Sequence, residues 1–184
     1  MVEVRQTALP GVLELRPIRR GDERGFFSEV WNARDWAAAG IDRPFVQDNH
    51  SCSARGVLRG LHYQLEPFAQ AKLVRVSRGR VLDVAVDIRA GSATFGRWAG
   101  AILSAEEWNQ LFIPPGFAHG FLALEDGCEV QYKVDALYSA AHDRGIDPFD
   151  PAIGVQWPME RSEILLSDKD RAAPLLKDAE AMRS

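Results

Sequence analysis

The sequence lacks the features that mark nucleic-acid-binding and membrane proteins. Its net charge is −4, and no long run carries one sign. That pattern argues against a nucleic-acid surface, which needs a clustered basic face, and against a basic helix on a membrane surface. No apolar stretch approaches the roughly 18 residues that a membrane-spanning helix needs. We therefore expect a globular protein that binds neither nucleic acid nor membrane.

The sequence also has few cysteines and no recognisable export signal. The first five residues show no apolar run behind a basic end, so we expect no signal peptide and a cytoplasmic protein. The only two cysteines, Cys52 and Cys128, are then expected to stay reduced, as small residues in or near the core. No repeat, low-complexity tract or linker divides the 184 residues, so we expect a single domain over residues 1–184.

Short extended runs fill most of the chain. Turn residues separate runs that are rich in branched and aromatic side chains. We expect strands at residues 12–18, 26–31, 72–76, 80–88, 98–103, 110–113, 120–124 and 129–134. Many short strands at such spacing are typical of an all-β sandwich or barrel.

Few segments favour helix. Residues 32–39 predict one that ends at Gly40, and residues 104–107 predict a short turn with a capping box. The tail, residues 167–182, also favours helix and should pack outside the barrel. Pro174 interrupts the tail, so two short pieces are expected.

The most informative segment is residues 56–64, which place a cation, a histidine and two further hydrogen-bonding side chains among glycines. Alternate side chains of a strand point to opposite faces, so Arg59 and Tyr63 would share one face and His62 and Gln64 the other. A purely structural strand would keep one face apolar. Polar groups on both faces therefore indicate a strand that lines a wet cavity.

A second histidine and a lysine lie in similar surroundings. His119 is framed by apolar residues in the segment 113–121, and Lys72 lies in an apolar run between the two histidines. One histidine on a strand is usually a satisfied structural residue. Two histidines and a lysine in strand-forming segments instead favour a site for acid–base chemistry.

Several motifs along the chain together carry a family resemblance. They are residues 22–29, 45–51, 56–64, 70–74, 83–89, 94–96, 115–121, 132–133 and 167–170. In this order and spacing they resemble the dTDP-4-dehydrorhamnose 3,5-epimerases, enzymes of dTDP-L-rhamnose synthesis, from about Glu14 to about Pro174. The resemblance implies a cupin-like jelly-roll barrel with a few short peripheral helices and a helical C-terminal tail.

The resemblance implies four catalytic residues. His62 matches the base, and Asp170 matches the carboxylate that fixes the tautomer of the base and stabilises its imidazolium. Tyr132 matches the general acid, because a phenol is protonated at neutral pH. Lys72 matches the cation beside the C4 ketone, where charge develops when a neighbouring proton leaves. The implied reaction converts dTDP-4-dehydro-6-deoxy-D-glucose to dTDP-4-dehydro-L-rhamnose by inversion at C3 and C5, without metal or cofactor.

The resemblance also implies ten substrate ligands. They are Arg24, Phe27, Glu29, Gln47, Asp48, Asn49, Arg59, His119, Asp143 and Lys169. Arg59 and His119 would contact the sugar and the developing oxyanion. The group of Arg24, Phe27 and Glu29 would bind the nucleotide, where an arginine can bond two phosphate oxygens at once. In the family this group comes from the neighbouring subunit, so the resemblance implies a homodimer.

One segment departs from the family pattern. Residues 146–151 read Ile-Asp-Pro-Phe-Asp-Pro, whereas many members carry a tryptophan shortly before the Asp150–Pro151 pair. This variant resembles related deoxysugar epimerases, some of which invert only one centre. A mono-epimerase therefore stays open as an alternative, since the loop would lie near Asp143 and restrict how the sugar turns.

Two other functions stay open. A metal-dependent cupin usually has two histidines one residue apart, but His62 is followed by Tyr63 and Gln64. Jelly rolls also include non-catalytic carbohydrate-binding proteins, and the fold alone does not exclude such a role. A binding protein, however, has no need of a base, an acid and an oxyanion cation together.

Overall fold

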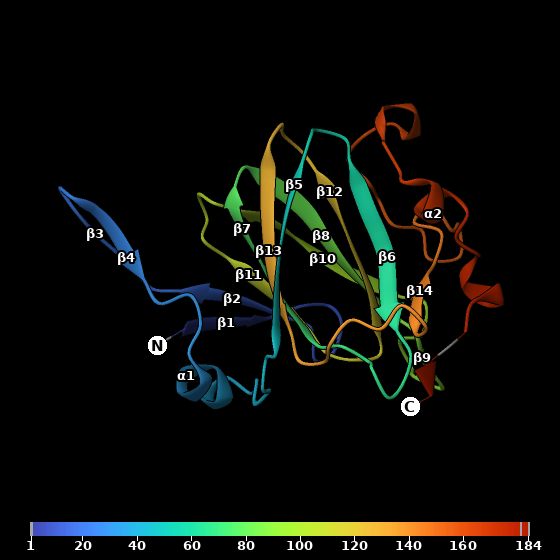
Figure 1. Ribbon diagram of the computed structural model, residues 1–184, viewed down its shortest axis with the longest axis horizontal. Helices are drawn as coiled ribbons and strands as arrows, with labels where there is room; N and C mark the ends of the chain where they lie inside the picture. The colour runs from blue at the N-terminus through green and yellow to red at the C-terminus, as the bar shows by residue number, and fades with distance from the viewer. Residues whose placement is uncertain (1, 181, 184) are drawn as a thin grey trace.

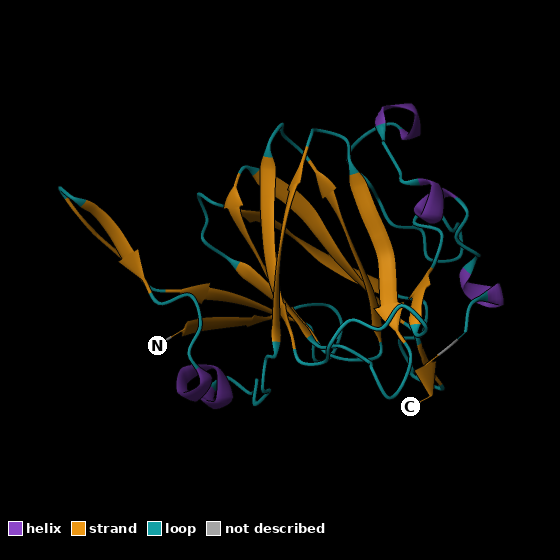
Figure 2. Cartoon of the chain, viewed as in Figure 1, coloured by secondary structure: helices purple, strands orange, loops and turns teal. Residues whose placement is uncertain are grey.

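The structure, a computed structural model that describes residues 2–180 and 182–183, is built around two antiparallel β-sheets (Figures 1 and 2). The six-stranded sheet has the order β1 (Val2–Gln6), β2 (Leu13–Pro17), β11 (Gln110–Ile113), β7 (Lys72–Arg78), β13 (Cys128–Val134) and β5 (Gln47–Ser53). The five-stranded sheet has the order β10 (Trp98–Ser104), β8 (Arg80–Asp87), β12 (Phe117–Ala123), β6 (Leu58–Gln64) and β14 (Asp143–Gly145). This is the all-β architecture that the sequence predicts.

An apolar core joins the facing sides of the two sheets. Alternate residues of each strand enter it, such as Val81 and Ala85 from β8 and Val74 and Val76 from β7. The residues between them point outward, as the two-residue period of a strand requires. At one end of the same interior the apolar residues give way to polar ones, and the candidate site lies there.

Helices and loops cover the outer faces. Residues of the C-terminal third, including Ile146, Ile153 and Leu176, pack on the outer face of the five-stranded sheet. Trp36 of α1 (Ala33–Ala38) packs on the outer face of the six-stranded sheet. The remaining elements are α2 (Asp168–Arg171), the 3-10 turns η1 (Arg161–Glu163) and η2 (Leu176–Asp178), and a parallel pair of β9 (Arg89–Ala90) with β15 (Met182–Arg183).

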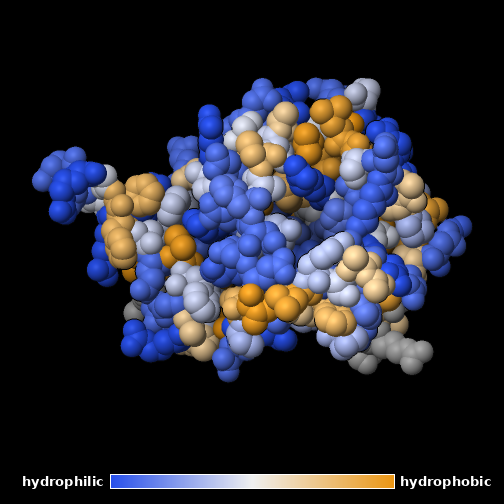
Figure 3. Space-filling model, in the orientation of Figure 1, coloured by the Kyte–Doolittle hydropathy of each residue, from blue (hydrophilic) through white to orange (hydrophobic). Residues whose placement is uncertain are grey.

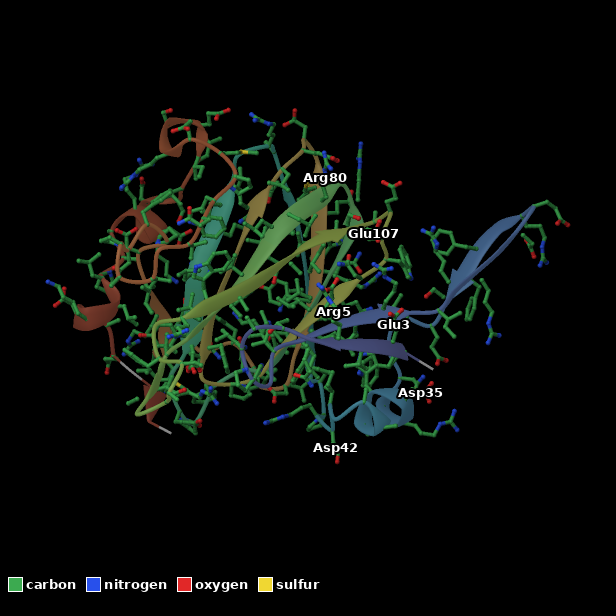
Figure 4. The ribbon with its side chains drawn as sticks, turned by 180° about the vertical axis from the view of Figure 1, so that it is seen from behind. Glu3, Arg5, Asp35, Asp42, Arg80 and Glu107 are labelled. Carbon is green, nitrogen blue, oxygen red and sulfur yellow. The ribbon has the colours of Figure 1, made fainter. Side chains whose placement is uncertain are left out.

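A hairpin of β3 (Arg19–Asp22) and β4 (Gly25–Ser28) projects away from both sheets (Figures 1 and 4). It carries large apolar side chains into solvent, since Phe26 is 57% and Phe27 is 72% exposed. Figure 3 shows the arm standing clear of the rest of the surface, with apolar residues along it and hydrophilic residues at its tip. Within the chain, Trp108 contacts the base of the arm through an edge-on ring contact with Phe26 at 4.9 Å and a hydrogen bond to Ser28 Oγ at 2.8 Å, and both phenylalanines still remain exposed.

Most strand predictions are confirmed within a few residues, and that for β11 matches both bounds. The predicted strand at residues 26–31 is shorter, because β4 ends at Ser28. The sequence patterns missed β1, β3 and β5, and also the short strands β9, β14 and β15. Strands β3 and β5 are polar on both faces, so neither shows the alternation that marks a half-buried strand.

The helix predictions are confirmed in outline. The Asn32 side chain caps α1 by accepting from Asp35 N at 2.7 Å, and Ser104 Oγ accepts from Glu107 N at 2.9 Å in the predicted turn. The tail forms α2 and η2 on either side of Pro174 and then β15 rather than more helix, while residue 181 lies outside the described residues. Among the described residues, no helix is long and apolar enough to cross a membrane.

Both cysteines are free, but only one is a core residue. Cys128 is buried, whereas Cys52 is exposed on the outer side of β5. The expectation of a core or near-core position is therefore wrong for Cys52, because β5 alternates and places its even-numbered side chains toward solvent.

Candidate active site

A cavity of about 570 Å³ opens between the two sheets at the polar end of the interior. Its volume lies in the range of small-molecule sites. Most of the predicted catalytic and sugar-binding residues line it: Asn49, Arg59, His62, Lys72, His119, Tyr132, Lys169 and Asp170. They come from β5, β6, β7, β12, β13 and α2, so residues far apart in sequence meet in one cavity.

Strand β6 brings Arg59 and His62 to the same cavity, although strict alternation would separate them. Pairing of β6 with β12 shifts register between His119 and Phe121, which interrupts the two-residue period. The two strands approach closely at this point, and a Cβ on Gly60 would lie 2.5 Å from the Cα of Gly120. The glycines of the motif thus permit the close approach that accompanies the register shift.

His62 and Asp170 form a hydrogen-bonded pair. The Nε2 of His62 lies 2.5 Å from Oδ1 of Asp170, which is 5% exposed at the start of α2. Ser167 caps this helix through Asp170 N, at 3.1 Å, and so fixes the carboxylate in place. Burial tends to raise the pKa of Asp170, but the hydrogen bond and charge of His62 and the Ser167 hydroxyl outweigh it and hold that pKa below its usual value.

Lys72 is a lysine held inside the barrel. It begins β7, is 7% exposed, and its Nζ lies 3.4 Å from the carbonyl oxygen of His62. Burial lowers the pKa of Lys72 to about 8, although the charges of Asp83 and Asp143 oppose this shift. The group can therefore be cationic at neutral pH and still be close to losing its proton.

Tyr132 enters the cavity from the sheet opposite His62. It lies on β13 of the six-stranded sheet, whereas His62 lies on β6 of the five-stranded sheet. Burial raises the pKa of the Tyr132 phenol, and the charge of Arg59 opposes this only in part. The phenol is therefore protonated at neutral pH and has a proton to donate.

His119 forms a second histidine–carboxylate pair, with a residue that the sequence analysis did not assign. Its Nε2 lies 2.9 and 3.1 Å from the two oxygens of Asp83, a fully buried residue of β8. Burial holds the pKa of His119 below its usual value, with partial opposition from Asp83. A signal was present in the sequence, because Asp83 shares the inward parity of Val81 and Ala85 in a valine-rich strand.

The three consecutive residues that were predicted as ligands at the start of β5 point to two different faces of the strand. Gln47 and Asn49 share one face and are joined by a hydrogen bond of 2.9 Å from Gln47 Nε2 to Asn49 Oδ1. Asp48 points to the opposite face and forms an ion pair with Lys133 Nζ at 2.7 Å. Of the three residues only Asn49 lines the cavity, which Gln47 reaches through its hydrogen bond to Asn49 and from which Asp48 points away.

A polar group lies beside the cavity at β14. Asp143 pairs with the Nζ of Lys169, which lines the cavity, and accepts from the hydroxyl of Tyr138 at 3.1 Å. Tyr138 was not singled out in the sequence, because nothing in its surroundings marks it apart from an ordinary exposed aromatic residue. Asp143 thus contacts a residue of the cavity wall, Lys169, and does not line the cavity itself.

The predicted nucleotide ligands do not line this chain's cavity. Arg24 and Phe27 lie on the projecting hairpin, and Glu29 follows directly after it. Arg24 is paired with Asp22, and Glu29 accepts from the Asn32 side chain. This chain alone does not bring the three residues together with His62.

The loop that departs from the family pattern lies behind β6, on the far side from the cavity. Ile146 packs on the outer face of the five-stranded sheet, and none of residues 146–151 lines the cavity. Trp157 ties the loop down by donating from Nε1 to the carbonyl oxygen of Pro148 at 2.9 Å. We expected this loop to restrict how the sugar turns, but no residue of the loop lies where it could contact a sugar in the cavity.

No group of three or more histidine, cysteine, aspartate or glutamate residues in the described part of the chain is placed to hold a metal ion. His62 and His119 lie directly opposite each other on β6 and β12, but each has a carboxylate partner on one ring nitrogen. The arrangement has the parts of proton-transfer chemistry: a paired base, a phenol and a buried cation.

Comparison with known proteins places this geometry in a family. A family model described as dTDP-4-dehydrorhamnose 3,5-epimerase matches residues 6–178. The dTDP-4-dehydrorhamnose 3,5-epimerase of Shigella flexneri is 52% identical over 180 residues, which cover 97% of this chain and 98% of that protein. The protein of the same name from Sinorhizobium fredii is 52% identical over 163 residues, 88% of this chain and 83% of that protein.

A solved structure is similar over the whole chain. The dTDP-6-deoxy-D-glucose-3,5-epimerase of Legionella pneumophila, in complex with dTDP-4-keto-L-rhamnose, superposes with a TM-score of 0.96 at 43% identity. The match covers 100% of this chain and 99% of that one.

Proposed function

The chain belongs to the dTDP-4-dehydrorhamnose 3,5-epimerase family and is an isomerase, and from this premise we propose the reaction and the role of each residue. The substrate is dTDP-4-dehydro-6-deoxy-D-glucose, and the product of inversion at C3 and C5 is dTDP-4-dehydro-L-rhamnose. The single observation that carries the proposal is the cavity in which the His62–Asp170 pair, Lys72 and Tyr132 meet. The cytoplasm is the proposed location, in line with two free cysteines.

His62 removes the proton. Its Nε2–H donates to Asp170, which leaves Nδ1 as the nitrogen with a lone pair for the sugar's α-proton. The imidazolium that forms is stabilised by the negative charge of Asp170. The shift in the pKa of Asp170 supports this role, because it keeps the carboxylate ionised at neutral pH.

Lys72 stabilises the intermediate. Loss of a proton beside the C4 ketone moves negative charge onto the ketone oxygen, and a fixed ammonium at that oxygen lowers the barrier. Burial strengthens this interaction, since it removes the water that would screen the two charges. Arg59 and His119 complete the sugar-binding wall from the five-stranded sheet.

Tyr132 returns the proton from the opposite side. Inversion requires that a carbon lose its proton on one face and regain it on the other. The base and the acid belong to different sheets of the barrel, so a sugar between the sheets would have one on each face. The raised pKa of Tyr132 keeps the phenol protonated at neutral pH, so a proton is present for transfer to the carbanion.

One set of groups serves both carbons. C3 and C5 both flank the C4 ketone, which acidifies the protons on each. The same base, cation and acid can therefore act twice if the sugar turns between the steps. The position of residues 146–151 outside the cavity supports double inversion, because no residue of that loop stands in the way.

Two chains complete the nucleotide site. The β3–β4 hairpin projects from the sheets with its phenylalanines exposed, and its Arg24 lies outside the cavity of its own chain (Figure 1). We propose that each hairpin crosses to the other subunit of a homodimer, where Arg24 and Glu29 bind the nucleotide and Phe27 packs on the base. Burial of Phe26 and Phe27 would contribute to pairing.

Mixing two inactive variants tests this crossing. An Arg24→Ala chain keeps His62, and a His62→Ala chain keeps Arg24. A mixed dimer regains one complete site only if Arg24 acts in the other subunit, so activity should appear after the two are unfolded and refolded together. An Arg24 that serves its own chain would give no recovery, and a monomeric mass in sedimentation would also reject the arrangement.

Incubation with dTDP-4-dehydro-6-deoxy-D-glucose in deuterated water tests the reaction. The product should carry two deuterons, one at C3 and one at C5, and a ketoreductase should convert it to dTDP-L-rhamnose. One deuteron after long incubation would identify a mono-epimerase. No exchange at either carbon would identify a binding protein without catalysis.

A further inference from the structure

Asp83 is a fully buried carboxylate that faces the interior of the barrel. It lies between the inward-facing Val81 and Ala85 of β8 and is 0% exposed. In the described part of the chain its oxygens accept only from Nε2 of His119. A buried carboxylate with one hydrogen-bond donor is costly unless positive charge lies close by. The catalytic roles assigned above do not use Asp83.

Several titratable and charged groups surround Lys72, the buried cation on which the charge of Asp83 acts. They are Arg59 and His62 on β6, Asp83 on β8, His119 on β12, Tyr132 on β13, Asp143 on β14, and Lys169 and Asp170 on α2. Each of the three carboxylates has a partner of its own. Asp143 pairs with Lys169, Asp170 with His62, and Asp83 with His119. Burial favours the neutral form of His119, so the charge of Asp83 acts on Lys72, more strongly than that of Asp143.

We infer that Asp83 is a positioning residue of the epimerase reaction, which fixes the tautomer and orientation of the buried His119 ring through its hydrogen bond and keeps the Lys72 ammonium protonated through its charge. The inference rests on the proposed function in one respect, namely that Lys72 acts as a cation beside the ketone. Asp83 would join His62, Lys72, Tyr132 and Asp170 as a residue on which the reaction depends, although it contacts no substrate atom.

The Asp83 hydrogen bond determines which nitrogen of His119 faces a ligand. Nε2 carries the proton that it donates to Asp83, so Nδ1 has a lone pair and no hydrogen-bond partner among the described residues. A neutral His119 can then accept a hydrogen bond from a sugar hydroxyl but cannot donate one to an oxyanion. His119 therefore orients the sugar, and the positive charge beside the ketone comes from Lys72. Burial of His119, which lowers its pKa, agrees with a neutral ring.

The charge of Asp83 also sets the pH range of the reaction. Burial alone favours the neutral amine, and a nearby anion favours the ammonium. With Asp83 present, Lys72 loses its proton as pH rises through about 8. Without it, the pKa should fall by about one unit or more, which would place the loss within the neutral range.

Nuclear magnetic resonance can follow both groups directly, because the chain holds only four lysines and four histidines. In the parent protein labelled at the lysine side chains, Lys72 should titrate near 8. In protein labelled at the histidine ring nitrogens, His119 should be neutral with its proton on Nε2. In Asp83→Asn, which keeps the size of the side chain, the pKa values of Lys72 and His119 should both fall.

A matched control separates charge from structure. Asp87 lies on the same inward parity of β8 and is also buried, but Arg89, Ser92 and Thr94 bind it away from the cavity. Asp87→Asn should leave the pKa of Lys72 and of His119 unchanged. If Asp83→Asn does not fold, Lys72→Met provides the second variant, because loss of the lysine charge should raise the pKa of His119.

Turnover completes the test. Relative to the parent, Asp83→Asn should turn over ~10-fold more slowly at about pH 8 and show a much smaller loss at about pH 6, where Lys72 is protonated in both proteins. A Lys72 that titrates at its ordinary 10.5, or that keeps its pKa in Asp83→Asn, would overturn the inference. A protein with the expected shifts but no exchange of the sugar's α-protons would instead reject the proposed function.

Discussion

Two of the histidines that line the cavity, His62 and His119, are each paired with an aspartate, but the two pairs differ in their access to solvent. The His62 side chain is 33% exposed and its Asp170 partner 5%, whereas the side chains of His119 and Asp83 are 6% and 0% exposed. An imidazole with room on its free nitrogen can exchange a proton with a substrate. One that is held in the core is kept neutral by burial. Position in the barrel thus decides which of two similar pairs is the base.

Removal of the accessible imidazole should have the largest effect. His62→Ala should slow exchange of the sugar's α-protons by at least ~10²–10⁴-fold, since a general base commonly contributes that much. Affinity for dTDP should be retained, because His62 does not bind the nucleotide. Deuterium uptake followed by mass spectrometry measures the loss.

His142→Ala is the matched control, because His142 bonds to Ser139 and does not line the cavity. Its exchange rate should equal that of the parent. Near-normal exchange in His62→Ala would assign the base to another residue, and the buried His119 would then be the candidate.

Loss of the buried cation should come next. Lys72→Met should lower turnover by ~10²–10³-fold, as for removal of other groups that stabilise a developing oxyanion. The KM should change much less, because the ammonium binds the enolate more strongly than the ketone. Lys133→Met removes a lysine on the outer side of the neighbouring β13 and should change neither value. Weakened binding with unchanged turnover would show that Lys72 only anchors the substrate.

A change to the partner of His62 should have a smaller effect. Asp170→Asn keeps a hydrogen-bonding group but removes the charge that stabilises the imidazolium. We expect exchange to slow by ~10–100-fold, less than in His62→Ala, because the base itself remains. Asp168→Asn, an exposed neighbour on α2, serves as the control. Equal losses in Asp170→Asn and Asp168→Asn would mean that α2 is merely perturbed.

Substitutions in the loop that packs behind β6 should have the smallest effect on the reaction. Trp157→Phe removes the hydrogen bond to the Pro148 carbonyl and should lower the free energy of unfolding by about 1 kcal/mol. The count of two deuterons in the product should stay the same, because this loop does not line the cavity. Denaturant unfolding and the deuterium count measure the two outcomes. A drop to one deuteron would mean that the loop acts on the sugar after all.

Two kinds of sequence signal were informative. Alternation of apolar and polar residues predicts the strands of the barrel, and the family motifs predict the residues that meet in the cavity. Strands such as β11 and β13 could be located because one face is apolar. Strand β5 could not, because its inward face is polar at the site and its outward face is polar at the surface. Motif order alone identified His62 and Asp170, which are 108 positions apart and lie 2.5 Å from each other.

Other features of the site could not be predicted from the sequence, because they depend on contacts between strands that are far apart in the chain. The register shift between β6 and β12 places Arg59 with His62, and no two-residue pattern predicts such a shift. Asp48 matched a motif, but its strand turns it away from Gln47 and Asn49. Asp83 begins the family motif at residues 83–89. Its proposed role depends on a hydrogen bond to a ring nitrogen of His119, which lies 36 positions later on another strand.

In the proposed mechanism base and acid reach the sugar from opposite sheets, and the variant Tyr132→Phe, assayed in deuterated water, tests this arrangement. Without the phenol, His62 can still remove an α-proton and return a deuteron on the same face. We predict that the unreacted substrate gains deuterium while the inverted product forms at least ~10²-fold more slowly than with the parent. Inversion at the parent rate in Tyr132→Phe would show that Tyr132 is not the acid, because the proton would then reach the opposite face from another group.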